Sequence, residues 1–372
     1  MDILGQTSIQ SILFFILYGI TFVVPLLAAF YLLLRRGNAI AKGVTPPVRL
    51  RRWTAAFFAV ASLAHVWWLL FYIYSGDQYS AASMVLALLD CVLLFTTFAG
   101  MLLSMLQDRR RPIWPVLVGL IPIVVLGGAF VVYPSQLTEQ ITVAYLVLLG
   151  LLFAAYMAFS IHLYGRWLND NYADLENKRV WLCQAVALGS MAMFILYVFA
   201  SEMVFIWLIH IIELVFVGLL LWRVETLPRL ETQTKEPSAP LASRREDGGE
   251  APINIDLALI EQLLAEHCVA TQLYLQHDLT LQQLAQAVGT NRSYLSQYFS
   301  RQGITYNTYI NNLRVNHFIS RYQELSAIKG KENIVAQELS LESGFRSYST
   351  FSRAFMQRTG QSVSVWMQGN AK

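Results

Sequence analysis

The chain has 372 residues, of which 56% are hydrophobic and only 14% are charged, and its formal net charge is +3. Because soluble proteins are closer to a quarter charged, this composition excludes a single water-soluble globule. Residues 1–223 hold 13 Lys/Arg and 10 Asp/Glu, whereas the shorter remainder holds 14 of each. The first part therefore suits an apolar solvent and the second part suits water. The three cysteines (Cys91, Cys183 and Cys268) are too widely spaced for a disulfide framework or a metal knuckle.

Seven segments of the first part are long and apolar enough to cross a bilayer. A hydrocarbon core about 30 Å thick requires roughly 20 residues of helix. The first segment lacks a basic flank and is too long for a cleavable signal peptide, so we expect it to be a retained helix. The predicted spans are residues 11–34, 53–74, 83–106, 114–132, 141–167, 180–200 and 203–222.

The basic residues of the connecting loops alternate strictly along the chain. The loops after spans one, three and five hold twelve Lys/Arg residues, whereas the N-terminus and the loops after spans two, four and six hold none. Loops rich in Lys and Arg stay on the cytoplasmic side of a membrane. We therefore predict that the N-terminus lies outside and that the chain beyond residue 223 lies in the cytoplasm.

Residues 224–252 combine four prolines and two glycines with many charged and hydroxyl-bearing residues, and they show no helical or strand period. Such a composition buries too little apolar surface to offset the entropy lost on ordering. We expect a flexible linker here. A chain of this length has an end-to-end distance on the order of 30 Å, so the following domain would be tethered near the membrane.

The spacing of residues 280–300 predicts two short helices joined by a tight turn. Thr280 with Gln283 resembles a capping box, Gly289 stands where a left-handed C-cap residue is expected, and Asn291 can cap the second helix. The pattern is typical of a helix-turn-helix unit. Its expected core residues are Leu284, Ala285, Leu295 and Phe299.

The same pattern recurs about 55 residues later. Gly344 corresponds to Gly289, and Ser347 takes the capping place of Asn291. Residues 306–323 between the two copies predict one helix that would hold the two units apart. The expected core residues of the second unit are Leu339, Phe345, Phe351 and Phe355.

Two stretches, LTLQQLAQAVGTNRSYLSQYFSRQGITYNTYINNLRV and ELSLESGFRSYSTFSRAFMQRTGQS, closely resemble the AraC/XylS family of bacterial transcription regulators. The resemblance covers about residues 253–368, and it implies an all-α module whose two recognition helices enter successive major grooves. Three positions depart from the family pattern: Phe318, Ser340 and Val363 stand where a small residue, alanine and proline are usual. The predicted fold is therefore all-α, with a seven-helix membrane bundle (1–223), a linker (224–252) and an AraC-type domain (253–372).

DNA binding needs basic groups for phosphates and polar groups for base edges, and residues 281–372 carry ten basic and four acidic side chains. By family position, the bases would be read by Ser293, Ser296, Gln297, Tyr348, Ser349, Ser352 and Arg353. Arg353 suits guanine and Gln297 suits adenine, because each can pair bidentately with that base. A solvated polar helix face is the alternative interpretation. The candidate phosphate contacts are Arg292, Arg301, Arg346 and Arg358.

Four ionisable residues, His65, Asp90, His210 and Glu213, fall inside predicted spans, where such groups are expensive and often functional. They are candidates for an outward-facing site that binds a ligand, a proton or a metal, and interhelical hydrogen bonding is the alternative. No spacing motif links them into a metal site, so we predict no metal and no cofactor. No catalytic motif is visible either, so we do not expect an enzyme.

These observations predict a transcription regulator embedded in the bacterial inner membrane, which senses a signal through the bundle and binds promoter DNA. The expected partners are double-stranded promoter DNA, the lipid bilayer, an unidentified effector and, as a candidate, a second copy of the chain in a homodimer. Coupling by bundle rearrangement, by a change of oligomeric state or by cleavage of the linker all remain open. The alternatives are a transporter or channel with a DNA-binding-like regulatory domain, and a membrane enzyme that uses the four intramembrane residues.

Overall fold

The computed structural model describes residues 9–74, 81–133, 135–175, 178–180, 203–230, 257–329 and 334–369, together with 184, 185, 188 and 189. These residues form helices and no named strand; their β-type pairing is one isolated bridge between Tyr172 and Thr280. The chain divides into two compact units, Met1–Tyr164 with Val180–Thr234 and Gly165–Arg179 with Lys235–Lys372. The all-α fold is thus confirmed for the described residues.

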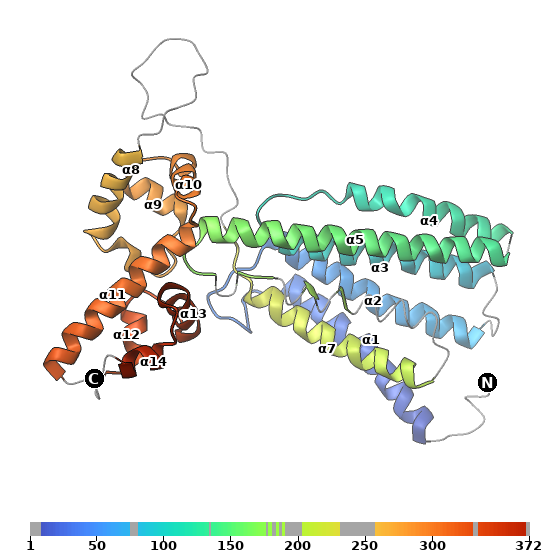
Figure 1. Cartoon of the computed structure of the whole chain (residues 1–372). Coiled ribbons are helices and arrows are strands. Elements are labelled where there is room, and N and C mark those ends of the chain that lie inside the picture. Colours follow the sequence, from blue (N-terminus) through green and yellow to red (C-terminus); the bar gives the residue numbers. More distant parts are fainter. Residues whose placement is uncertain are drawn as a thin grey trace, which may run out of the picture. The chain divides into compact units, whose positions relative to one another are not determined.

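The first unit is built of long apolar helices that run alongside one another (Figure 1). Its close helix pairs include α1 with α2, α2 with α3, α3 with α4, and α1 with α7. The predicted sixth span, residues 180–200, lies almost entirely outside the described residues. The helices are α1 (Ile9–Leu34), α2 (Val48–Tyr74), α3 (Ala81–Met105), α4 (Trp114–Val132), α5 (Gln136–Asn171) and α7 (Met203–Thr226).

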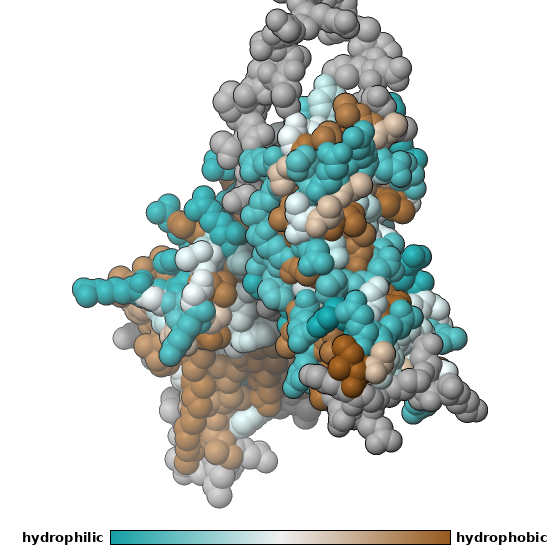
Figure 2. Space-filling model, turned by 90° about the vertical axis from the view of Figure 1, so that its left-hand side faces the viewer, coloured by the Kyte–Doolittle hydropathy of each residue, from teal (hydrophilic) through white to brown (hydrophobic). Residues whose placement is uncertain are grey.

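Five of these helices are long and apolar enough to cross a membrane. They carry large apolar side chains on their outer surfaces, such as Leu34 and Leu151, which are 74% and 62% exposed. Figure 2 shows continuous hydrophobic colour on the surface of this unit, whereas the surface of the C-terminal unit is mostly hydrophilic. Exposed apolar surface on this scale is typical of helices in contact with lipid. The helix α2 covers the second predicted span.

The first residues of the predicted linker are instead packed into the bundle. Helix α7 continues to Thr226, and Leu227 and Leu230 are buried beyond it. Glu225 is fully buried and forms an ion pair of 2.9 Å with Arg35 at the end of α1. Residues 224–230 are therefore part of the folded bundle, although they fall within the predicted linker (224–252), whose remaining residues lie outside the described part of the chain. The overall composition of residues 224–252 did not predict this packing. Three apolar residues (Val224, Leu227 and Leu230) and the paired carboxylate of Glu225 are enough to hold the start of the segment in the bundle.

The second unit contains seven α-helices among its described C-terminal residues, with a π-helical turn η1 (Ala265–Val269) and a 3-10 turn η2 (Leu273–Leu275) after the first. Helix α11 runs between the group α8 to α10 and the group α12 to α14 (Figure 1), and it contributes to two hydrophobic cores. Its first half contributes Tyr306 and Ile310 to one core, and its second half contributes Val315 and Phe318 to the other. The helices are α8 (Leu257–Leu264), α9 (Leu281–Ala287), α10 (Arg292–Arg301), α11 (Tyr306–Lys329), α12 (Ala336–Glu342), α13 (Tyr348–Thr359) and α14 (Val363–Gly369).

Local chemistry explains where the short helices begin and end. Thr280 and Gln283 form a capping box at the start of α9, and the Asn291 side chain accepts the backbone N–H of Tyr294 at the start of α10. Ser347 caps α13 in the same way. Gly289 has φ +74°, a left-handed conformation that favours glycine in the turn between α9 and α10. The structure confirms these predicted caps and turns.

The three departures from the family pattern are all core positions. Phe318 is fully buried, with its ring centroid 4.4 Å from that of Phe351 and 5.8 Å from that of Phe355. Ser340 is fully buried and donates a hydrogen bond of 2.7 Å to the carbonyl oxygen of Gln337. Val363 is 2% exposed. The larger Phe318 is thus accommodated by aromatic packing in the second core.

Candidate nucleic-acid interface

Helix α10 presents a polar face to solvent and an apolar face to the first core. Leu295 and Phe299 are 0% and 2% exposed, because they pack against α9 and the start of α11. Three of the predicted base-reading residues (Ser293, Ser296 and Gln297) are exposed on the other side. Together with Arg292 and Ser300 they line a shallow open hollow. The structure therefore places these predicted residues together on one accessible surface.

Helix α13 repeats this arrangement over the second core. Phe351 and Phe355 are fully buried. The predicted base-reading residues Tyr348, Ser349 and Arg353 are exposed, and Ser352 is half-buried. The Arg353 side chain folds along its own helix, with Nε donating to the carbonyl oxygen of Ser349 at 3.2 Å. This weak, exposed hydrogen bond leaves the guanidinium accessible to a base or a phosphate.

The four predicted phosphate-binding arginines fall into two pairs. Arg301 and Arg358 lie exposed at the C-terminal ends of α10 and α13. Arg292 and Arg346 lie at or just before the N-terminal ends of these helices, and both are engaged within the protein. Arg292 donates from Nε and a terminal nitrogen to Asn171 Oδ1 at 2.9 and 2.5 Å.

Arg346 is held by two carboxylates. Its Nε lies 3.6 Å from Oδ2 of Asp174, and a terminal nitrogen donates to Oδ2 of Asp278. Asp174 is 3% exposed, so its charge is little screened by water, whereas the side chain of Asp278 is 49% exposed. Of the two predicted phosphate contacts at the N-terminal ends of the recognition helices, Arg292 is therefore bound by a neutral amide oxygen and Arg346 by two carboxylates, which carry the negative charge that a phosphate would bring.

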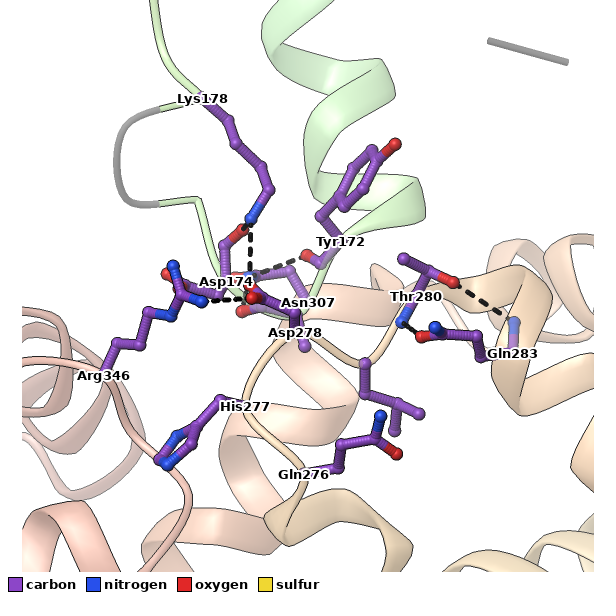
Figure 3. Close-up of polar contacts among 12 residues, drawn as sticks. Tyr172, Asp174, Lys178, Gln276, His277, Asp278, Thr280, Gln283, Asn307 and Arg346 are labelled. Atoms are coloured by element: carbon purple, nitrogen blue, oxygen red, sulfur yellow. Dashed lines mark hydrogen bonds and ion pairs between the residues drawn. The ribbon is translucent and has the colours of Figure 1, made fainter. Parts of the chain in front are cut away.

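Two of the residues that hold these arginines, Asn171 and Asp174, belong to a segment that was predicted to be part of the membrane domain; Figure 3 shows Asp174 beside Arg346. After α5 ends, Tyr172 pairs with Thr280, and Asn307 donates to the carbonyl oxygens of Tyr172 and Ala173 at 3.2 and 2.7 Å. Ala173 is fully buried in the first core. Further along, Lys178 donates to the carbonyl oxygen of Asp174 at 2.7 Å. The described residues 171–175 and 178, here called the juxtamembrane strap, are thus part of the C-terminal unit.

One basic residue counted towards DNA binding has a structural role instead. Arg314 is 1% exposed and donates to the carbonyl oxygens of Tyr274 and Gln276, both at 2.7 Å. Its guanidinium also lies 5.7 Å from the centre of the Phe345 ring. Burial lowers the pKa of Arg314 to about 10, so it remains a cation at neutral pH. It stabilises the loop before α9 and cannot reach a phosphate.

In the first unit, the structure brings three of the four predicted intramembrane residues together. Donor atoms of His65 on α2 and of His210 and Glu213 on α7 lie within 4.8 Å of one another. Asp90 lies on α3, outside this cluster, and it is 8% exposed. The i,i+3 spacing of His210 and Glu213 could be seen in the sequence. The proximity of His65 could not, because it depends on the packing of α2 against α7.

Comparison with protein families gives a match for the C-terminal unit: residues 284–369 match a helix-turn-helix domain family. No curated protein and no solved structure matches the chain significantly. The matched range includes most of α9 and all of α10 to α14, and hence both recognition helices. The C-terminal part of this protein is therefore a helix-turn-helix DNA-binding domain of the AraC type, joined to a region of apolar helices compatible with a membrane.

Proposed function

We propose that this protein is a one-component transcription regulator of the inner membrane, in which the helical bundle senses a signal and the C-terminal domain binds promoter DNA. The observation that carries the proposal is the pair of exposed polar faces on α10 and α13. Each face lies above a buried apolar face, and the single helix α11 joins the cores beneath them. An ordinary solvated helix gives no reason for the same polar face to occur twice. Two recognition helices that enter neighbouring major grooves each need such a face.

The membrane part of the proposal rests on the apolar helices and on the distribution of basic residues. The twelve Lys/Arg residues in alternate loops favour a cytoplasmic location for the C-terminal domain, where DNA is accessible. A reporter enzyme fused after residue 372 provides a direct test. Activity of a reporter that works only in the cytoplasm supports this topology, and activity of one that works only in the periplasm contradicts the proposal.

Arg353→Ala is expected to weaken binding to the specific promoter by roughly 1–3 kcal/mol and to relax the preference at one base pair. The reason is that Arg353 is exposed on α13 at a predicted base-reading position, where a guanidinium can pair bidentately with guanine. Full-length protein in lipid nanodiscs is incubated with genomic fragments, the bound fragments are sequenced, and the affinity for the most enriched fragment is measured with each base pair changed in turn.

Arg321→Ala is the matched control, because Arg321 is also exposed but lies on α11, where it pairs with Glu324. Its affinity should stay within twofold of the wild type. An equal loss on every sequence in Arg353→Ala would reassign that residue to a phosphate contact. If no fragment is enriched by the wild-type protein, the proposal of sequence-specific binding is wrong.

We infer further that helix α5 and the juxtamembrane strap couple the two parts. Helix α5 has 36 residues, about 54 Å at about 1.5 Å per residue, which exceeds a hydrocarbon core about 30 Å thick. Its last residue, Asn171, already contacts Arg292. A movement of this helix would therefore change how strongly the strap holds Arg292 and Arg346. This favours bundle rearrangement among the coupling routes considered.

Asp174→Asn is expected to increase the affinity of the full-length protein for promoter DNA by roughly 1.4–5-fold, which corresponds to the loss of an ion pair that contributes about 0.2–1 kcal/mol. The substitution removes the buried carboxylate that competes with DNA phosphate for Arg346. The affinity is measured by fluorescence anisotropy at two salt concentrations, because a freed phosphate contact also steepens the salt dependence.

Asp170→Asn removes the same charge one turn earlier, from an exposed residue of α5, and serves as the control for a general charge effect. It should change the affinity by less than half as much as Asp174→Asn. Equal effects of both variants, or weaker binding by a correctly folded Asp174→Asn protein, would contradict competition by the strap.

A further inference from the structure

The cluster of His65, His210 and Glu213 has the dimensions of a metal site. Glu213 Oε2 lies 3.4 Å from His65 Nε2 and 3.8 Å from His210 Nδ1. Around a tetrahedral ion with bonds of about 2.0–2.2 Å, neighbouring donor atoms are about 3.3–3.6 Å apart. Both separations to Glu213 are therefore close to those of a bound ion, and all three donor atoms lie within 4.8 Å of one another.

The tautomer of His65 also suits a ligand. Its Nδ1 lies 2.8 Å from the carbonyl oxygen of Ala61, an acceptor, so Nδ1 carries a proton. The lone pair of neutral imidazole is then on Nε2, which points towards the Glu213 carboxylate. A carbonyl that accepts the second N–H of a histidine is the usual support of a metal-ligating imidazole. Two facing lone pairs need a proton or a metal cation between them, and a metal ion is the one of these that would also engage His210.

The cluster is largely buried, so the negative charge of Glu213 needs a nearby positive charge. His65 is 9% exposed, and the side chains of His210 and Glu213 are 12% and 22% exposed. Within the described part of the chain, the buried Nδ1 of His210 has no hydrogen-bond partner. The ring of Tyr18 lies 5.0 Å from that of His65 and 5.5 Å from that of His210. An anionic carboxylate in such a setting is costly unless a positive charge compensates it.

The donor set selects the kind of ion. Two neutral imidazoles and one carboxylate suit zinc and other first-row transition metals, whereas Mg²⁺ and Ca²⁺ prefer oxygen donors. Three protein ligands leave a fourth position of a tetrahedral site for water or an exogenous group. The two helices α2 and α7 each supply part of the set, so binding would fix one helix against the other.

We propose that His65, His210 and Glu213 bind a divalent transition-metal ion in the membrane domain, and that this ion belongs to the class of signal that the protein senses. The binding site stands on the geometry alone. Its role as a sensor rests on the proposed function. An ion that pulls α2 and α7 together stabilises one arrangement of the bundle over another, which is what an effector must do.

The test uses full-length protein in nanodiscs, stripped of metal with a chelator and titrated with Zn²⁺ against a competing chromophoric chelator. We expect one tight Zn²⁺ per chain and no tight binding of Mg²⁺. Glu213→Gln and His65→Gln should weaken Zn²⁺ binding by more than about 100-fold, since loss of a mere supporting group costs about 10–100-fold. His162→Gln is the control, because this histidine is exposed on α5, away from the cluster.

Glu213→Gln keeps the shape of the side chain, and its elution on size exclusion is compared with the wild type so that misfolding is recognised. If a correctly folded Glu213→Gln protein binds Zn²⁺ as tightly as the wild type, or if the wild type binds none, the metal site is wrong whatever the DNA experiments show. Promoter affinity is then measured with and without Zn²⁺. A change of more than threefold that disappears in Glu213→Gln supports the sensor role; unchanged affinity in a protein that binds both Zn²⁺ and DNA overturns that role alone.

Discussion

Gly344→Ala is expected to destabilise the C-terminal domain by roughly 2–5 kcal/mol. Gly344 has φ +86°, a left-handed conformation that costs an L-residue about 1–2 kcal/mol. An added Cβ would also lie 2.8 Å from both Cα and the carbonyl oxygen of Leu275, which are backbone atoms that cannot move aside cheaply. Such overpacking costs about 1–3 kcal/mol more. The stability is measured by pulse proteolysis of the full-length protein in increasing urea.

Gly289→Ala is a matched control, because Gly289 takes the corresponding place in the first helix-turn-helix unit. Its φ is +74°, but nothing lies within 4 Å of an added Cβ. It should therefore show the conformational cost alone, about 1–2 kcal/mol. Equal losses in the two variants would mean that the close approach of Gly344 to Leu275 does not contribute to stability.

Arg314→Met is expected to have a similarly large effect, roughly 3–5 kcal/mol, although it replaces a charged side chain by an apolar one of similar length. The substitution leaves the buried carbonyl oxygen of Tyr274 and the partly buried carbonyl oxygen of Gln276 without their donor, and hydrogen bonds to charged groups contribute about 1.5–3 kcal/mol each. Hydrogen exchange followed by mass spectrometry should show faster exchange in residues 273–281 and around residue 345.

The control for this variant is Arg321→Met, two turns further along α11. Its side chain is 42% exposed and pairs with Glu324, so the loss should stay below about 0.5 kcal/mol. Promoter affinity adds a second criterion. If Arg314→Met weakened DNA binding while leaving hydrogen exchange unchanged, Arg314 would be a phosphate contact after all, and its structural assignment would be wrong.

The elements that the sequence predicted best are those that depend on a few neighbouring residues. The capping box of Thr280 with Gln283 and the left-handed glycines needed only local chemistry, and the structure has them at the expected residues. The long apolar helices followed from composition in the same way. Helix boundaries were less accurate: α11 extends to Lys329 instead of 323, because no strong stop signal follows residue 323.

The roles of individual charged residues were predicted least well from the sequence. Arg314 was included among the basic residues available for DNA binding. A sequence does not show that the Arg314 guanidinium donates to three backbone carbonyl oxygens of the loop before α9. Glu225 was placed in a flexible linker, because its partner Arg35 is 190 residues away. Both errors come from contacts between residues far apart in the chain.

The amino-acid sequence by itself determined which part of the chain suits an apolar environment and which part suits water. It also determined the helical periods, the caps and the duplicated helix-turn-helix pattern. Each of these depends on composition or on residues a few positions apart. Only the tertiary structure decided that the strap after α5 packs with Asn307 and holds Arg346, and that His65 meets Glu213. These contacts join segments separated by more than a hundred residues. Their existence depends on how whole helices pack, which local patterns do not encode.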